Sequence, residues 1–155
     1  MADIYDIDTY QPRKGVGYLL NRVRSELLAA LDEALRSDPE LASLEISSAQ
    51  FIVVAALALS DTANSSSDLC KGISYDAGAM TRMIDRLESK GLLRRNRRPD
   101  DRRVVYVELT EEGHRAFPRM RLVAMGVVNR FLRGFSQAEA RQLESYLSRM
   151  LENAA

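Results

Sequence analysis

The sequence of 155 residues has few of the residues that form disulfides and metal sites, with one cysteine, Cys70, and one histidine, His114. A single cysteine excludes an intramolecular disulfide, and one histidine with one cysteine is too few for a typical zinc site. Neither a glycine-rich phosphate loop nor a GxSxG pattern occurs. We therefore predict no enzymatic activity, no metal and no other cofactor.

Long apolar runs are also missing. The longest, FIVVAALAL at 51–59, has nine residues, whereas a membrane-spanning helix needs about 20. The first residues, MADIYDIDTYQPRKG, are acidic and polar, unlike a signal peptide. The length suits one domain, which can bury a core without disulfides. We expect this domain to lie in the reducing cytoplasm and to have no membrane partner.

The chain has no net charge overall, with 22 basic and 22 acidic residues, but the two signs are unevenly distributed. Residues 1–70 carry a net charge of −6 (five basic, eleven acidic), whereas residues 71–105 carry +5 (ten basic, five acidic). Six arginines lie in RRNRRPDDRR at 94–103. Because salt limits the influence of each charge to about 8–10 Å, this local excess can attract a polyanion despite the neutral total.

The first half of the chain predicts two helices. Apolar residues at spacings of three and four indicate a long helix over 16–35, which SDPE at 37–40 ends. The next segment is apolar on nearly all sides. Ser47 with Gln50 three residues later is a capping box, so we expect a central buried helix to begin there.

A helix-turn-helix is expected next. SSDLCKG at 66–72 predicts a short helix, ISY a turn, and DAGAMTRMIDRLESKG at 76–91 a second helix that ends at Gly91. The apolar side of this second helix is predicted to hold Ala77, Met80, Met83, Ile84 and Leu87. The other side holds small and polar residues, as a helix in a DNA groove would need: Gly78, Ala79, Thr81, Arg82, Asp85, Arg86 and Ser89.

A β-hairpin and two further helices complete the chain. LLRRNRR and RVVYVELT are separated by PDD, which favours a turn. A hairpin directly after a helix-turn-helix is a winged helix, so the fold class is mainly α with a small β-hairpin wing. Thr110 is expected to cap the next helix, and Ser136 with Glu139 to form the capping box of the last. That last helix has an apolar stripe: Leu143, Leu147, Met150 and Leu151.

Residues 74–113 resemble the winged-helix core of the MarR family of bacterial transcription regulators. The resemblance rests on the TR..DRLE..GL helix, the D-x-R signature at Asp101, Arg102 and Arg103, and LTEEG at the start of the following helix. It implies a homodimer held by N- and C-terminal dimerisation helices, here 12–38 and 111–155, around a DNA-binding lobe at 45–110. It also implies a repressor of transcription that releases DNA when a phenolic or other aromatic acid binds.

The partner is then double-stranded operator DNA. Arginine donates bidentate hydrogen bonds to guanine or phosphate, and narrow minor grooves attract it. We assign the major groove and its flanking phosphates to Thr81, Arg82 and Arg86, and the minor groove to Arg102 or Arg98. Backbone phosphate contacts are expected from Ser74, Tyr75 and the hairpin. The predicted DNA-binding set is Ser74, Tyr75, Gly78, Ala79, Thr81, Arg82, Arg86, Arg98, Arg102 and Arg103.

Two aspartates are expected to brace the wing. The resemblance implies that Asp85 pairs with a wing arginine, for which Arg103 is the candidate, while Asp101 belongs to the turn signature. The neighbouring arginines could also have purely structural roles. Arg82 and Arg86 could pair with nearby carboxylates instead of DNA, and either Arg94 or Arg95 could face the protein.

The ligand is not specified by the sequence. We hypothesise a pocket bordered by the first, second and fifth helices, in which Tyr18, Arg22, Phe51 and His114 offer aromatic walls and a cation to an aromatic carboxylate. His114 is also consistent with a plain surface residue, and Cys70 with a small buried hydrophobe rather than a redox sensor. A winged-helix dimer serving only as a protein-interaction module remains the rival function, although it would not need six arginines in its hairpin.

Overall fold

The computed structural model describes residues 3–60, 64–73, 75–98 and 101–154, except for the side chains of 97, 98 and 101–103. Six α-helices and a small sheet make up this part of the chain, so the predicted fold class is confirmed. The elements in chain order are α1 (Val16–Ser37), the 3-10 turn η1 (Ala42–Leu44), α2 (Ser48–Ala58), β1 (Asn64–Ser65), α3 (Ser66–Ile73), α4 (Ala77–Ser89), β2 (Leu93–Arg98), β3 (Asp101–Leu109), α5 (Glu111–Phe131) and α6 (Gln137–Glu152).

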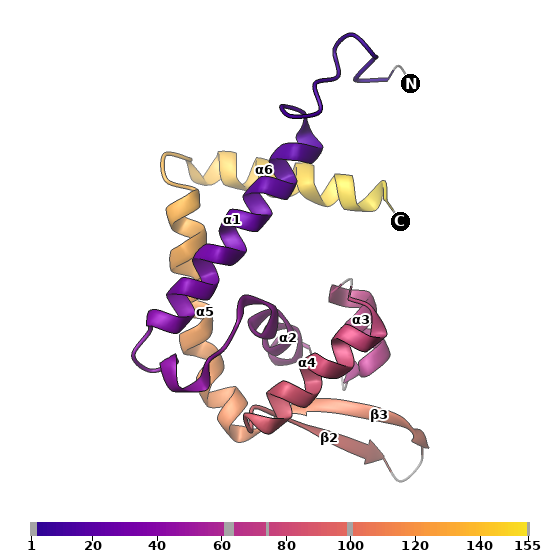
Figure 1. The fold of residues 1–155 in the computed structure, drawn as a ribbon, viewed down its shortest axis with the longest axis vertical. Helices are drawn as coiled ribbons and strands as arrows, with labels where there is room; N and C mark the ends of the chain where they lie inside the picture. Colours follow the sequence, from indigo (N-terminus) through magenta and orange to yellow (C-terminus); the bar gives the residue numbers. More distant parts are fainter. Residues whose placement is uncertain (1–2, 61–63, 74, 99–100, 155) are drawn as a thin grey trace.

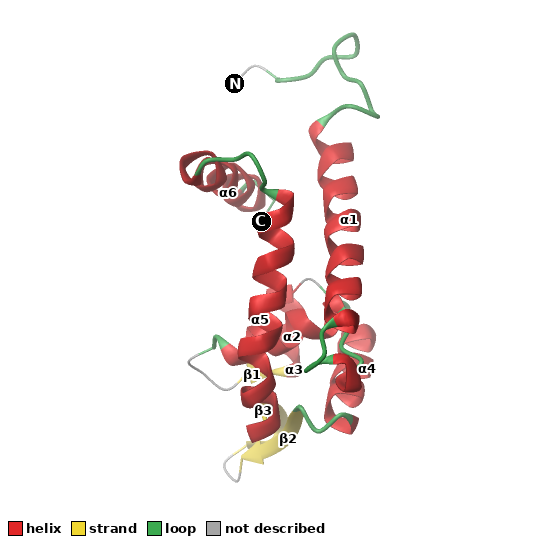
Figure 2. Cartoon of the chain, turned by 90° about the vertical axis from the view of Figure 1, so that its left-hand side faces the viewer, coloured by secondary structure: helices red, strands yellow, loops and turns green. Residues whose placement is uncertain are grey.

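Figure 1 shows two regions. Helices α1 and α5 pack side by side, and α6 crosses their upper end. Helices α2, α3 and α4 with the hairpin form a lobe at the lower end. Figure 2, turned by 90°, again places α6 and the hairpin at opposite ends of α5.

The predicted hairpin is part of a three-stranded antiparallel sheet, in the order β1-β3-β2. Strand β1 was not predicted, because its two residues pair with Val107 and Tyr106 far along the chain. In the hairpin Leu93 lies opposite Leu109, and the register shifts between Arg97 and Arg98. The wing is thus joined to the start of α3 as well as to the end of α4.

The core lies inside the lobe and continues along α5 as far as Val127, where Leu31 and Leu35 of α1 also belong to it. Helix α2 is apolar on all sides and begins at the predicted capping box, in which Ser47 and Gln50 bond each other's backbone N–H. Cys70 is half-buried against this core. The largest fully buried side chains are Leu35, Leu41, Val53, Val54, Met80, Ile84, Leu87, Leu92, Leu93, Val107 and Met120.

Glycine occupies two positions that flank the hairpin and that a larger residue would not fit. Gly91 follows α4 with φ of +71°, a conformation that glycine adopts without strain. Gly113 lies in the first turn of α5, where a Cβ would come within 2.1 Å of the Leu92 carbonyl oxygen. Helix α5 can therefore approach the start of β2 only if residue 113 has no side chain.

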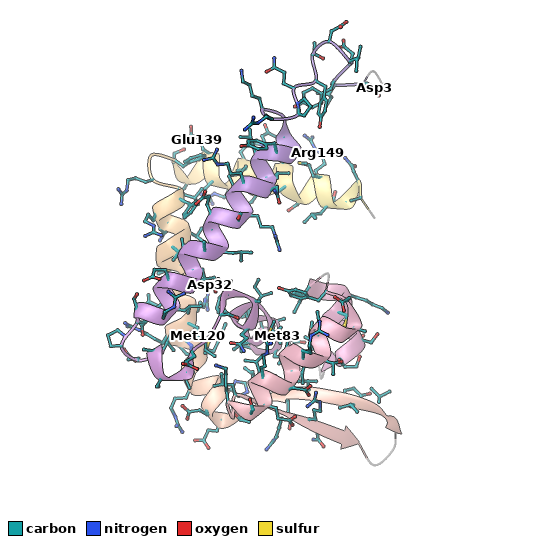
Figure 3. All side chains as sticks on the ribbon, in the orientation of Figure 1. Asp3, Asp32, Met83, Met120, Glu139 and Arg149 are labelled. Atoms are coloured by element: carbon teal, nitrogen blue, oxygen red, sulfur yellow. The ribbon has the colours of Figure 1, made fainter. Side chains whose placement is uncertain are left out.

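The upper region lacks such a core. Helix α6 is described along its whole length, and none of its residues is buried, although its predicted capping box is present. In Figure 3, Met83 and Met120 lie in the lower region, whereas Glu139 and Arg149 lie on α6. Large apolar side chains remain exposed on the three terminal helices: Val16, Leu19, Leu20, Val23, Leu122, Met125, Val128, Leu143, Tyr146, Met150 and Leu151.

Candidate nucleic-acid interface

Helix α4 separates its apolar and polar sides sharply. Asp76 caps the helix by accepting a hydrogen bond from the Ala79 N–H at 2.8 Å. Met80, Ile84 and Leu87 are at most 1% exposed. Ala77 was wrongly predicted on the buried side: it is exposed because, as the first residue of the helix, it lies past the edge of the core.

The opposite side of α4 offers the side chains predicted to touch DNA. Thr81, Arg82 and Arg86 are all exposed. The Thr81 hydroxyl donates to the Ala77 carbonyl at 2.8 Å, so Thr81 presents its methyl group and an acceptor oxygen. Gly78 is exposed beside Arg82, whose Nη1 would lie 3.4 Å from a Cβ at residue 78. A Cβ there would be in ordinary van der Waals contact with the guanidinium.

Arg82 and Arg86 form no ion pair with any residue that the structure describes. The simpler reading, in which both pair with nearby carboxylates, is not observed among these residues. Ion-paired arginine must give up its partner before it can bind phosphate or a base edge. These two guanidinium groups are instead exposed and available.

The two described arginines of β2 are paired. Arg94 Nε lies 2.6 Å from Glu108 Oε1 on the neighbouring strand. Arg95 turns the other way and bonds Asp85, at 2.5 Å, and Glu88, both on α4. Partial burial opposes its charge, but the hydrogen bonds to Asp85 and Glu88 outweigh this and raise the Arg95 pKa. Arg95 is therefore the arginine that faces the protein, and it ties the wing to α4.

This tie was not predicted as such. Asp85 was expected to pair with Arg103, but the Arg103 side chain lies outside the described residues, so that pairing stays a prediction. The missed signal is the spacing of Asp85 and Glu88, which lie three residues apart on one face of α4. Both carboxylates face the strand that begins five residues after Glu88.

Several other predicted residues cannot be placed. Ser74 lies outside the described residues, as do the side chains of Arg98, Asp101 and Arg102, whose backbone belongs to the hairpin strands.

Two other predicted DNA-binding residues are partly covered. Ala79 is half-buried. Tyr75 is half-buried against the core, and its backbone N–H donates to the Cys70 carbonyl at 3.2 Å. It lies immediately before the cap of α4.

The predicted ligand residues lie on three helices. Tyr18 accepts a long hydrogen bond of 3.5 Å from Arg22 on the exposed side of α1. Phe51 packs against the core and His114 is exposed on α5. None of the four lines the hollow of about 560 Å³ between α1, α2 and α3. The lining of that hollow is apolar apart from one arginine and one tyrosine hydroxyl: Arg24, Leu28, Ile52, Ala56, Gly72, Ile73 and Tyr75.

No helix in the described part of the chain is long and apolar enough to cross a membrane. No group of three or more histidine, cysteine, aspartate or glutamate side chains there is arranged to hold a metal ion.

Comparison with known proteins gives consistent results. The model of the MarR family matches residues 46–105. The uncharacterized HTH-type transcriptional regulator YdgJ of Bacillus subtilis is 36% identical over 89 residues, which are 57% of this chain and 54% of YdgJ. The chain thus spans little more than half of the length of this curated relative.

Solved structures match over a longer stretch. A mutant MarR of E. coli complexed with operator DNA is 31% identical, with a TM-score of 0.75 over 88% of this chain and 93% of that one. BpsR of Bordetella bronchiseptica, solved to explain regulation of its DNA binding by 6-hydroxynicotinic acid, is 26% identical, with a TM-score of 0.75 over 92% of this chain and 98% of that one.

Proposed function

The chain belongs to the MarR family of transcription regulators, and on this premise we propose that it is a homodimeric repressor of a pseudo-palindromic DNA operator, released by a small aromatic or phenolic ligand. Because the chain belongs to this family, it is a DNA-binding regulator and not an enzyme. The observation that carries the proposal is the exposed face of α4, where Arg82 and Arg86 are unpaired among the described residues while Arg94 and Arg95 are paired.

On DNA, α4 enters the major groove. Arg82 and Arg86 donate to guanine edges or to the flanking phosphates, and the Thr81 methyl group suits contact with a thymine methyl. The wing follows the backbone, with Arg98 or Arg102 near the minor groove. Two copies related by a two-fold axis contact half-sites whose centres are about 10 base pairs apart.

The exposed apolar surface of the terminal helices supports the homodimer. No residue of the amphipathic helix α6 is buried, so the described part of the chain leaves most of its apolar stripe uncovered. Large exposed apolar patches on soluble proteins mark interaction sites. Association of α1, α5 and α6 with the same helices of a second copy would cover them.

The ligand binds in the hollow between α1, α2 and α3. Arg24 supplies a guanidinium for a carboxylate, and Leu28, Ile52 and Ile73 supply apolar walls for a ring. Tyr75 lines the same hollow and directly precedes α4. A ligand that moves Tyr75 would shift the start of α4, and it would lower DNA affinity to the extent that it binds the shifted state better.

A mobility-shift assay on the DNA upstream of the reading frame tests the proposal. Arg82→Ala and Arg86→Ala should each weaken specific binding by about 1–3 kcal/mol, while Arg141→Ala on α6, which removes the same charge far from the lobe, should change it little. Unchanged binding in both α4 variants would refute the assignment of α4. A dimer with no specific DNA binding would favour the protein-interaction module.

The same assay is repeated with a panel of aromatic carboxylic acids. We expect one or more of them to release DNA from the wild-type protein. Arg24→Gln should still bind DNA but need more of the acid for release, because the guanidinium partner of the carboxylate is gone. Equal sensitivity in wild type and Arg24→Gln would place the ligand elsewhere.

A further inference from the structure

The connection between α1 and α2, residues 38–47, is held at both of its ends. Leu41 and Ile46 are 2% and 3% exposed and anchor it in the core. Between them Glu45 has φ of +47°, a left-handed conformation that non-glycine residues rarely adopt. A backbone in this conformation persists only where its surroundings hold it.

Polar side chains from three helices hold this connection. Arg119 of α5 places Nε and Nη2 at 2.9 and 2.7 Å from Asp38 Oδ2. Asp32 of α1 accepts a hydrogen bond from the Ser48 N–H at the other end. Lys90 Nζ donates to the carbonyl oxygens of Leu44 and, at 2.9 Å, Glu45.

The third of these contacts joins the connection to α4. Lys90 is the C-cap residue of α4, where a cation also interacts favourably with the negative end of the helix dipole. Helix α4 otherwise packs chiefly against α3 and β2, which belong to the same lobe. Lys90 therefore links the end of α4 to the connection, and Arg119 links the connection to α5.

We propose that Lys90 is a positioning residue for DNA binding: by holding the Leu44 and Glu45 carbonyls it fixes the angle of α4 relative to α1 and α5, and so the distance between the two α4 helices of a dimer. This inference rests on the proposed function. It assigns Lys90 no contact with DNA, since the ammonium is engaged with backbone carbonyls. What Lys90 controls is which spacing of half-sites the dimer accepts.

The test compares wild type with Lys90→Met, which keeps the apolar stem and removes the ammonium. The probe is a duplex selected by the wild-type protein from a random-sequence library, together with the same duplex carrying one central base pair more or fewer. One base pair moves a half-site by about 3.4 Å and turns it by about 35°. We expect wild type to lose about 100-fold in affinity on the altered duplexes, and Lys90→Met to lose about tenfold or less.

Two control variants separate positioning from a general loss of affinity. Lys90→Arg retains donors for the carbonyls and should restore the discrimination between spacings. Arg86→Ala should weaken binding to all three duplexes by the same factor and leave the discrimination unchanged. If Lys90→Met does not fold, as judged by circular dichroism, Lys90→Ala replaces it under the same criterion, because it also removes every donor of the side chain.

The outcomes are distinct. Discrimination as strong in the Lys90 variant as in wild type would overturn this inference and leave the proposed function intact. A wild-type protein that selects no duplex, or only one without two-fold symmetry, would overturn both. Weaker discrimination in Lys90→Met that Lys90→Arg restores would support the positioning role.

Discussion

Helices α4 and α6 are both amphipathic, yet the chain covers the apolar side of only one of them. Met80, Ile84 and Leu87 of α4 are almost completely buried in the core of the lobe, where α4 packs against α3 and β2. Helix α6 is longer, but Leu143 and Met150 on its apolar stripe are 38% and 43% exposed. The lobe therefore folds around a well-covered core that it shares with α1 and α5, whereas the described part of the chain leaves much of the apolar stripe of α6 exposed.

The largest expected effect is a difference in stability between two leucine-to-alanine substitutions, one in each region. Leu87→Ala leaves a cavity under α4 and should lower the free energy of unfolding by about 2–5 kcal/mol. Leu151→Ala, at a residue 74% exposed on α6, should change it by less than about 0.5 kcal/mol. Urea unfolding followed by circular dichroism, at low protein concentration, measures both. A similar cost at the two sites would mean that α6 is as well packed as α4 in a single chain.

The second prediction concerns association. Leu143→Asp with Met150→Asp places two carboxylates on the apolar stripe and should weaken the dimer by about 2–4 kcal/mol, as measured by sedimentation equilibrium. The same two charges at Ser145 and Ser148, which lie on the polar side of α6 and are exposed, form the matched control. Dimers equally strong in both double variants would show that the stripe is not part of the interface.

The third prediction tests whether the ion pairs between β2 and α4 contribute to DNA affinity. Arg94→Gln and Arg95→Gln each remove one positive charge from β2, so long-range attraction to DNA falls equally. Only Arg95→Gln detaches the wing from Asp85 and Glu88, and it should cost about 1 kcal/mol more in DNA affinity. Fluorescence anisotropy on one operator duplex measures the difference. Equal losses would indicate that the wing needs no tie to α4.

The smallest effect is expected where the two regions meet. The hydrogen bond from Arg119 holds the pKa of Asp38 below its ordinary value of 3.8. A carboxyl group with a lowered pKa in the folded state contributes stability that is fully present above about pH 4 and is lost as the pH falls through the folded pKa. Asp38→Asn should therefore lower stability at neutral pH and flatten its decline below pH 4.

Thermal unfolding from pH 7 to pH 2.5 would show this change in slope. Glu33→Gln is the control, because the exposed Glu33 pairs with Arg36 on the same helix and contributes little. An acid profile of Asp38→Asn parallel to that of wild type would contradict the assigned role of the Arg119 contact.

Features with local causes were predictable from the sequence. The capping boxes at Ser47 and Ser136, the Thr110 cap and the end of α4 at Gly91 depend on residues at most four positions apart. All of them are present. The buried side of α4 was also predicted from periodicity, except at Ala77, where the pattern cannot tell how far the core extends.

Features that depend on distant partners were not predictable. Strand β1 has two residues and exists only through its pairing with β3. The partner of Asp85 depends on which face of β2 Arg95 occupies, and the tie from Lys90 spans 45 residues of sequence. The hollow between α1, α2 and α3 likewise combines residues from three helices, so composition and spacing alone pointed to other side chains.

The absence of any buried residue in α6 also bears on how long a copy of the protein survives in a cell. A helix of 16 residues without tertiary packing is marginally stable in water, so in an unassembled copy it opens readily and exposes its backbone to proteases. The proposed homodimer would keep the helix closed. We expect surplus unpaired copies to be degraded first, so that assembly as well as synthesis sets the amount of regulator present.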